Sequence, residues 1–327
     1  MHDIEQHPLQ VVWKNSTNTA PLALVGSFRF GERSDERSFP FAWLDMPVLG
    51  YSDSCGDEIW CSSRHISYGE IGNIRYSKAE NFIFGIISLE ENDLNALDKL
   101  TTEGYSELLG FLSDSGFHEI WRLWNHFSDI NSESSGLERY RQFNIGRQVA
   151  FDYAEGLMKG RMPAASAVGV RSGPLTIAFL AGKSPPTLIE NAAQVSAYEY
   201  PEMYGPQSPS FSRGAIANLG PFNLVLVSGT ASIKGHETVN LGDPYEQTLT
   251  ALHNIQIVIE TAERQCGIHI DLSHMYYRAY VRNAEDLLEV QRAVTHCLGQ
   301  SVQVHYVQAD ICRRDLLVEI EATGYAD

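Results

Sequence analysis

The sequence predicts an α+β fold of two similar halves, each a mixed β-sheet with helices packed on one face. In both halves, strand-like and helix-like segments follow the same order of strand, helix, strand, helix, strand and strand. Repetition on this scale indicates two similar domains, and helices that alternate with strands must cover a face of the sheet. The breaking sequence Ser184-Pro185-Pro186 separates the halves, which predicts domains at residues 1–185 and 186–327.

The first half begins with residues 22–69, which are rich in Gly, Ser, Pro and aromatic residues and predict short strands and loops. The helix predicted at 98–115 has its apolar residues at helical spacing, and Gly116 ends it. The repeat comprises a strand at 81–88, a helix at 98–115, a strand at 119–127, a helix at 136–156, and two strands within 164–181.

The second half repeats this order with a strand at 222–228, a helix at 245–266, a strand at 274–282, a helix at 284–298, and strands at 302–307 and 316–322. When the halves are aligned, Ala178 corresponds to Glu319, and Arg171 corresponds to Cys312. An acidic residue therefore occupies this position in only one of the two similar sheets.

The final predicted strand carries two glutamates. Because side chains alternate along a strand, Leu317, Glu319 and Glu321 share one face, while Val318 and Ile320 share the other. One interpretation is an ordinary half-buried strand with its glutamates in water. The alternative is a functional acid, which the unique position of Glu319 in the repeat favours.

The overall charge excludes some partners. The chain has 41 acidic and 24 basic residues, a net charge of −17, which argues against binding nucleic acid or an anionic membrane. It shows neither a signal peptide nor an apolar segment long enough to span a membrane, so we expect a cytoplasmic protein.

Neither a metal nor a cofactor is expected. The five cysteines (Cys55, Cys61, Cys266, Cys297 and Cys312) are odd in number and lack Cys-x-x-Cys pairs, so they predict neither disulfides nor a zinc site. His236 and Glu237 lie near Asp243 but lack the spacing of metal ligands. The glycine-containing segment 228–235 fits no phosphate-binding motif.

Three segments offer side chains for an anionic ligand. Residues 196–214 form a long aromatic loop with Arg213 as its one cation, residues 139–147 carry three arginines, and Arg278 and Arg282 share a strand face. Arginine binds carboxylates in a two-pronged manner, so arginines that converge on a pocket would indicate a carboxylate substrate. The alternatives are an ordered loop that packs its own rings, and ordinary surface charges.

Two family resemblances rest on these segments. The second half, through Phe211-Ser-Arg213, Leu226-Val-Ser-Gly-Thr230 and the final strand, resembles the Rid imine deaminases. That family has a carboxylate-binding arginine in the preceding strand, and residues 299–307 contain none. Over nearly its full length the chain more closely resembles the chorismatases, through Trp124-Asn125, Tyr140-Arg-Gln-Phe143, Gly146-Arg147, the run from Tyr204 to Arg213, Ser228-Gly-Thr-Ala-Ser-Ile233, Gly235-His236 and Cys312 with Glu319.

The chorismatase resemblance implies two Rid-like domains and an enzyme that removes pyruvate from chorismate without metal or cofactor. Cys312 lies seven residues before Glu319, a spacing that resembles members producing 3-hydroxybenzoate, including a subclass that also yields 4-hydroxybenzoate, for pigment or quinone pathways. Glu319 would donate a proton to the enol ether, and Cys312 would shape a dry wall or assist ring opening. The expected substrate-binding residues are Arg147, Tyr140, Tyr198, Tyr200, Arg213, Ala231, Arg278 and Arg282.

Other functions remain open at this point. They are a chorismate hydrolase that yields a dihydroxycyclohexadiene carboxylate, a Rid-like enamine or imine deaminase, and a non-catalytic module that binds an aromatic acid. The state of assembly is open as well. Rid relatives are trimers with sites between subunits, and a tandem chain could form that interface internally as a monomer.

Overall fold

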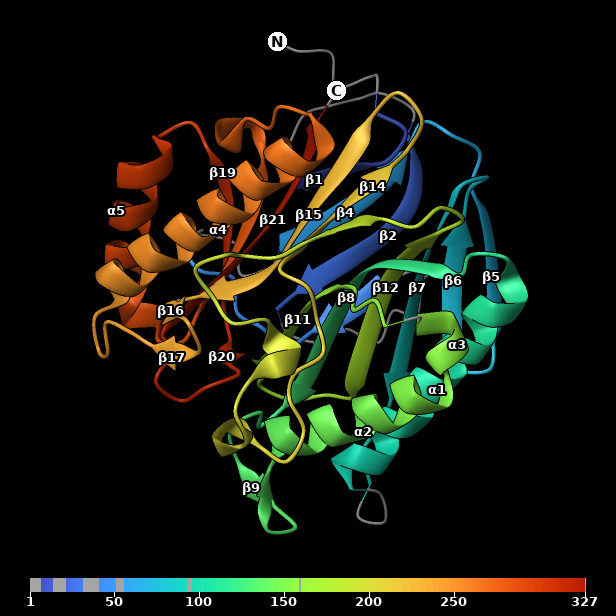
Figure 1. Cartoon of the computed structure of the whole chain (residues 1–327), viewed down its shortest axis with the longest axis horizontal. Coiled ribbons are helices and arrows are strands. Elements are labelled where there is room, and N and C mark those ends of the chain that lie inside the picture. Colours follow the sequence, from blue (N-terminus) through green and yellow to red (C-terminus); the bar gives the residue numbers. More distant parts are fainter. Residues whose placement is uncertain are drawn as a thin grey trace.

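The computed structural model describes residues 7–13, 22–31, 41–50, 56–92, 96–158 and 160–326. Two large mixed sheets face each other, and each carries a pair of long helices on its outer face (Figure 1). The predicted α+β class is therefore confirmed.

The first large sheet has seven strands in the order β20-β11-β8-β12-β7-β6-β5. Its strands are β5 (Ser67–Ile71), β6 (Ile74–Lys78), β7 (Phe82–Leu89), β8 (Glu119–Ser128), β11 (Ala164–Val170), β12 (Leu175–Gly182) and β20 (Asp310–Ile311). Helices α1 (Leu97–Ser115) and α2 (Arg139–Tyr153) cover its outer face, and α3 (Glu155–Met158) follows α2. A small hairpin of β9 (Glu133–Ser134) and β10 (Leu137–Glu138) precedes α2.

The second large sheet has six strands in the order β13-β14-β15-β21-β18-β19. Its strands are β13 (Thr187–Ile189), β14 (Gly214–Asn218), β15 (Asn223–Ala231), β18 (Tyr276–Val281), β19 (Gln303–Gln308) and β21 (Val318–Ala326). Helices α4 (Pro244–Cys266) and α5 (Leu287–Leu298) cover its outer face, and β16 (Ile233–Lys234) pairs with β17 (Glu237–Thr238). Short 3₁₀ turns are η2 (Ala197–Glu199), η3 (Glu202–Tyr204), η4 (Leu272–His274) and η5 (Ala284–Asp286).

Local sequence explains where α4 begins and ends. The Asp243 carboxylate accepts a hydrogen bond of 3.0 Å from the Glu246 backbone N–H, and Pro244 supplies a first helical residue that needs no such partner. At the other end, Gly267 adopts a left-handed conformation with φ of 68°, which glycine tolerates without steric cost.

The repeat is visible in the order of the strands. Apart from β20, the order β11-β8-β12-β7-β6-β5 in one sheet corresponds to β19-β18-β21-β15-β14-β13 in the other. Each half therefore contains a leading antiparallel pair of strands, β5-β6 or β13-β14, in addition to the strands that the sequence predicts. The first pair is a hairpin, whereas the long loop 190–213 joins the second. Except for β20, strands before and after residue 186 belong to different sheets, while the domain limits 1–185 and 186–327 stay a prediction.

The short strands predicted in the N-terminal region are present and form a sheet. Strands β1 (Gln10–Trp13), β2 (Ala23–Phe30), β3 (Phe41–Leu44) and β4 (Gly56–Ser62) form a separate four-stranded sheet in the order β1-β4-β2-β3. Its apolar residues, among them Phe28 and Trp60, join the central core between the two large sheets.

The acidic face of the last strand points into the molecule. Glu319 and Glu321 are only 4% and 6% exposed, whereas Val318 and Ile320 pack under α4 as the alternation predicts. The interpretation of water-exposed glutamates on this strand is therefore wrong. The inner faces of both sheets form the central core, so a carboxylate there needs a partner or a proton.

Hydrogen bonds join the halves directly beside these glutamates. The Ser228 hydroxyl accepts from the Ala165 N–H at 2.9 Å and donates to the Ser212 carbonyl at 2.6 Å. The Ser212 N–H in turn donates to the Pro163 carbonyl at 3.0 Å. Strands β11 and β15, from different halves, are thereby held in fixed register at the site described next.

Candidate active site

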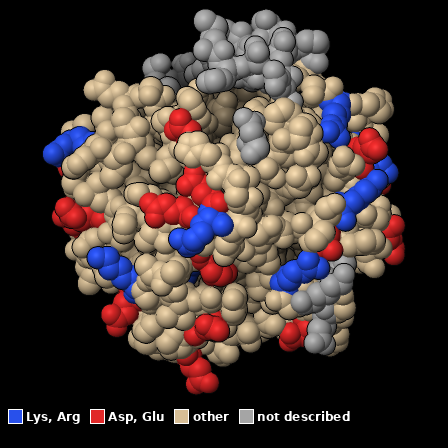
Figure 2. Space-filling model, turned by 45° about the horizontal axis from the view of Figure 1, so that its top comes forward, with Lys and Arg blue, Asp and Glu red and all other residues tan. Residues whose placement is uncertain are grey.

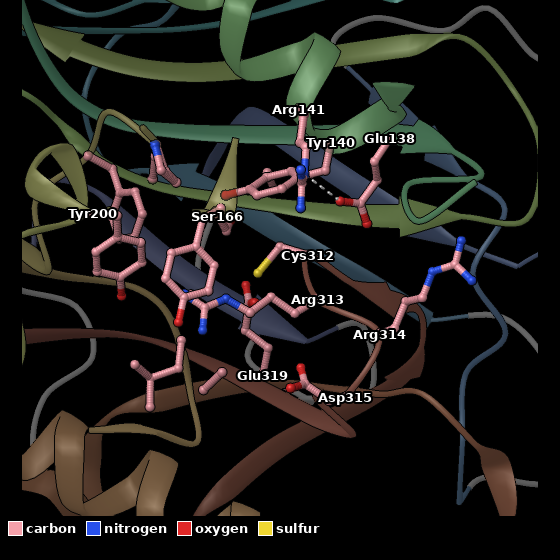
Figure 3. Close-up of a pocket in the computed structure, with 18 of the residues that line it drawn as sticks. Glu138, Tyr140, Arg141, Ser166, Tyr200, Cys312, Arg313, Arg314, Asp315 and Glu319 are labelled. Carbon is pink, nitrogen blue, oxygen red and sulfur yellow. Dashed lines mark hydrogen bonds and ion pairs between the residues drawn. The ribbon is translucent and has the colours of Figure 1, made fainter. Parts of the chain in front are cut away.

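A cavity of about 270 Å³ lies where the two halves meet. Figure 3 shows side chains from both halves around it, with Tyr140 from α2, Ser166 from β11, Cys312 from the segment before β21, and Glu319 from β21. Other residues that line the cavity are Arg147, Tyr200, Tyr204, Phe211, Arg213, Gly229, Ala231 and Arg313.

Glu321 is held as an anion behind the cavity. Its Oε2 accepts from Arg122 at 2.5 Å and from Ser166 at 2.9 Å, and its Oε1 lies 2.8 Å from an Arg278 nitrogen and accepts from Tyr280 at 3.1 Å. Burial alone would raise the pKa of Glu321, but Arg278 and Arg122 outweigh burial and hold the pKa below its usual value.

Glu319 faces the cavity and lies in the opposite environment. Within the described part of the chain, no protein group donates a hydrogen bond to it. Burial raises the pKa of Glu319 to about 8, and the neighbouring Glu321 charge adds to the rise while Arg122 and Arg213 partly oppose it. At neutral pH this side chain is therefore mainly a protonated acid that can donate.

The strand next to Glu319 leaves room for it. Ala231 of β15 is its register partner, and Gly229 lies so close that a Cβ there would overlap Glu319 Oε1. The small residues of the segment Ser228-Gly-Thr-Ala231 thus allow the carboxyl group to reach the cavity.

Two buried guanidinium groups face the same cavity. The Arg147 Nη2 donates to Asn144 Oδ1 at 3.0 Å, and the Arg213 Nη2 donates to the Val195 carbonyl at 3.1 Å and to the Tyr200 hydroxyl at 2.9 Å. Among the described residues neither forms a salt bridge, and the Nε of each is buried without a partner. Two buried cations that form no salt bridge suit a ligand with negative charge.

Two further groups on the wall are neutral donors. Burial raises the pKa of the Cys312 thiol to about 12, with the Glu319 charge adding to the effect. Burial also raises the pKa of Tyr140 well above its usual value. Cys312 is therefore a thiol and not a thiolate in the free protein, which argues against a nucleophilic role.

The aromatic loop closes one side of the cavity. The rings of Tyr200 and Tyr204 lie 5.6 Å apart, and the Arg313 guanidinium lies 4.0 Å from the Tyr204 ring centroid. The Arg213 guanidinium lies 5.0 Å from the Phe211 ring centroid. Rings that hold cations by this stacking form an ordered wall, so the loop lines the site as the sequence suggested.

Three predicted binding residues lie elsewhere. Arg278 is committed to Glu58 and Glu321 behind the cavity, and Tyr198 is 45% exposed outside the lining. Arg282 donates to the backbone carbonyls of Leu316, Ile311 and Arg313 and pairs with Asp310. The sequence predicted that Arg278 and Arg282 lie on one face of a strand. It could not show which groups from other parts of the chain bind them. Arg282 instead holds the segment that carries Cys312.

The sequence reasoning missed several residues at or behind the site: Arg122, Ser166, Glu58 and Arg313. For Arg122 a signal existed, because a charged residue in the apolar strand Ile120-Trp-Arg-Leu-Trp124 has to find a buried partner. For Glu58 no local signal exists, since its partner Arg278 is 220 residues away.

The described residues contain no group of three or more His, Cys, Asp or Glu side chains placed to hold a metal ion. The cysteines Cys61, Cys266, Cys297 and Cys312 are free, while Cys55 lies outside the described residues. In the described part, no helix is long and apolar enough to cross a membrane.

On the face in Figure 2, basic side chains are dispersed and many lie beside acidic ones.

A protonated carboxylic acid and two buried guanidinium groups that line one cavity suit an enzyme that performs acid chemistry on a small anion. Residues 58–181 match the family model "Chorismatase FkbO/Hyg5-like, N-terminal". A protein of Streptomyces hygroscopicus named 3-hydroxybenzoate synthase is 34% identical over 274 residues, covering 81% of this chain and 80% of that protein. The chain belongs to the chorismatase family.

Other comparisons agree. A chorismatase of Streptomyces rapamycinicus is 34% identical over 278 residues, covering 81% of this chain and 80% of that protein. A crystal structure of a chorismatase superposes with a TM-score of 0.85 at 29% identity, covering 96% of this chain and 98% of that one. The likeness thus extends over both halves.

Proposed function

We propose that this protein converts chorismate into 3-hydroxybenzoate and pyruvate. The observation that carries the proposal is the environment of Glu319, a buried acid that keeps its proton at neutral pH and faces a cavity lined by two buried guanidinium groups, each with an unpartnered Nε. The relatives named 3-hydroxybenzoate synthase and chorismatase support the choice of substrate and product.

Substrate binding follows from charge. Chorismate carries two carboxylates, and Arg147 and Arg213 offer two guanidinium groups from opposite halves of the chain. Each has an unpaired buried N–H, so binding of a dianion would satisfy groups that the free protein leaves without partners. The ring of the substrate would then lie between Tyr140, Cys312 and Glu319.

In the proposed reaction, Glu319 protonates the methylene carbon of the enol ether, which leaves an oxocarbenium-like centre and weakens the bond between the ether oxygen and the ring. The neighbouring ring hydroxyl displaces that oxygen, so pyruvate departs and an arene-oxide-like species forms. The proton that the hydroxyl releases restores Glu319. Opening of the three-membered ring and loss of a ring proton give the phenol, without net gain or loss of water.

The outcome depends on water. If a water molecule attacks the activated carbon, the product is a dihydroxycyclohexadiene carboxylate, as in a hydrolase. Tyr140, Phe211, Ala231 and the Cys312 thiol line the cavity, and burial keeps both the phenol and the thiol neutral. Such a wall disfavours ordered water at the reacting carbon and supports the hydroxybenzoate product.

The test is a product analysis with chorismate. We expect equimolar pyruvate and 3-hydroxybenzoate by chromatography, with Glu319→Gln as the inactive control. A dihydroxycyclohexadiene carboxylate, with pyruvate but without aromatic acid, would establish a hydrolase instead. Unconsumed chorismate, together with tight binding of hydroxybenzoate, would contradict the enzyme and indicate a binding module. A ratio of 3- to 4-hydroxybenzoate from the same chromatogram assigns the subclass.

A further inference from the structure

A chain of four alternating charges runs from the N-terminal sheet to the strand of the acid. Glu58 of β4 binds Arg278 of β18 through the arginine Nε at 2.9 Å and through its Nη2. The remaining Arg278 nitrogen lies 2.8 Å from Glu321 Oε1, and Glu321 Oε2 accepts from Arg122 of β8 at 2.5 Å. The order is therefore Glu58, Arg278, Glu321, Arg122.

All four members are buried, so water does little to screen them. Burial raises the pKa of Glu58, but its contacts with two Arg278 nitrogens oppose that rise and favour the ionised form. With Glu58 ionised, two cations and two anions cancel, and the chain as a whole offers Glu319 no net positive charge. Glu319 lies two residues from Glu321 on β21, and Glu321 raises its pKa while Arg122 opposes that rise. Burial is the largest cause of the raised pKa of Glu319, and the charge balance of the chain adds to it or opposes it through Glu321 and Arg122.

Glu58 has a defined place in this balance. It occupies the Nε and Nη2 edge of Arg278, which leaves Nη1 directed at Glu321, and the Trp60 indole N–H donates to its other oxygen at 2.8 Å. Without the Glu58 charge, Arg278 and Arg122 would exceed Glu321 by one positive charge. An uncompensated buried cation would favour the ionised form of Glu319.

The other charged or titratable groups near these carboxyls do not replace Glu58. Around Glu58 they are Arg278, Glu321, Tyr280 and Tyr325, and both tyrosines are neutral because burial raises their pKa values. Around Glu319 they are Glu321, Arg122, Arg213, Tyr140 and Cys312. His126 lies beside the arginines, but burial and Arg278 lower its pKa to about 3, so it adds no charge at neutral pH.

We propose that Glu58 is a positioning residue for the proposed reaction and that, through Arg278 and Glu321, it keeps Glu319 in its proton-donating form. The inference rests on the proposed function for its catalytic meaning, but the protonation of Glu319 can be measured without substrate. It assigns the N-terminal sheet a role in the chemistry, although Glu58 does not line the cavity.

The experiment is a ¹³C NMR titration of the full-length protein with labelled glutamate side-chain carboxyls. The signal that disappears in Glu319→Gln identifies the acid. In Glu58→Gln we expect the midpoint of that signal to fall by about half a pH unit or more, because one compensating charge is lost. A folded Glu58→Gln protein in which Glu319 titrates at the wild-type midpoint would overturn the proposal.

Two further variants make the result specific. Trp60→Phe removes the indole donor to Glu58, so it should lower the Glu319 midpoint in the same direction by a smaller amount, and it serves if Glu58→Gln does not fold. Asp57→Asn removes a charge from the adjacent position of β4, whose side chain faces Arg29 instead. Asp57→Asn should therefore leave the Glu319 midpoint unchanged. A shift equal to that of Glu58→Gln would mean that any nearby charge affects Glu319, which contradicts a specific path through Arg278 and Glu321.

The pH profile of kcat/KM with chorismate gives the functional readout. The basic limb of Glu58→Gln should move to lower pH together with the NMR midpoint, whereas a merely structural role would lower activity at every pH. If the wild type releases no pyruvate while the NMR midpoint still shifts, the proposed function fails and the control of Glu319 by Glu58 stands.

Discussion

Glu319 and Glu321 are two residues apart on one strand, yet their pKa values are displaced in opposite directions. Two arginines, a serine and a tyrosine surround Glu321, whereas Glu319 is buried at the cavity with the Glu321 charge beside it. The two carboxyls therefore have different roles: Glu321 is a fixed negative charge, and Glu319 is a proton donor.

Glu319→Gln should lower turnover of chorismate by ~10²-fold or more, because an amide cannot donate the proton that the reaction requires. In the wild type, kcat/KM should decline as pH rises through about 8, where burial and Glu321 place the pKa of Glu319. Steady-state pyruvate release between pH 6 and 10 measures both. A wild-type profile that stays flat to pH 10 would rule out Glu319 as the proton donor.

The same substitution should stabilise the protein at alkaline pH. The unfolded chain releases the Glu319 proton near pH 4.5 and the folded chain near pH 8, so wild-type stability from this group falls as pH rises between those values. The advantage of Glu319→Gln in the free energy of unfolding should therefore grow over this window by a few kcal/mol at most and then level off. Urea unfolding of both proteins at pH 5 and 8.5 tests this; an equal difference at the two pH values would contradict it.

Gly229→Ala should reduce activity while the fold is retained, since the added methyl group would overlap Glu319 Oε1 and displace the carboxyl from the cavity. Gly110→Ala is the matched control, because a Cβ there would meet nothing within 4 Å. Circular dichroism and the pyruvate assay distinguish misfolding from displacement. Full activity of Gly229→Ala would mean that the position of Glu319 is not critical.

Arg147→Gln and Arg213→Gln should each lower kcat/KM by about 10- to 100-fold, the usual cost of losing a hydrogen-bonded charge pair with a ligand. The effect should be mainly on KM where the arginine only binds the substrate. Arg292→Gln, in which the arginine is exposed on α5 and paired with Glu289, is the control and should behave like wild type. Unchanged kinetics in both cavity variants would remove the proposed carboxylate contacts.

Cys312→Ala should alter the product distribution toward the hydrolysis product, because it removes a thiol from the dry wall without removing the acid. The raised pKa of Cys312 also predicts slow alkylation by iodoacetamide at pH 7 compared with the exposed Cys297. Chromatography of products and mass spectrometry of alkylated peptides measure the two effects. An unchanged product ratio would exclude Cys312 from the branch point.

The sequence predicted the central element of the site for a physical reason. Alternation along the last strand placed Glu319 and Glu321 on one face, and the repeat contrasted Glu319 with Ala178, which the structure places on the inner face of the other sheet. Arg147 and Arg213 were found because they lie in unusual local segments. Arg278 was misassigned, since its buried partner Glu58 comes from a sheet that composition did not predict.

The strand register shows which residues occupy equivalent positions in the two sheets. The register pairs Glu319 with Tyr280 and Glu321 with Arg278, while Ala178 pairs with Trp124 and Leu180 with Arg122. When Ala178 and Glu319 are aligned, Arg122 and Arg278 thus occupy corresponding places, and both bind Glu321. A repeat can be detected from sequence order, but which copy keeps the charge partners depends on contacts across the core.

Because Arg147 and Glu319 belong to different halves, the distance between the acid and the substrate depends on how one sheet rests on the other. A small sliding of β15 along β11 would misalign the reacting atoms even with every side chain of the cavity intact. Substitutions in the apolar layer between the sheets, remote from the cavity, can therefore change the rate or the product without appreciable unfolding. The alignment of the acid with the substrate therefore depends on the packing of both sheets and not only on the residues that line the cavity.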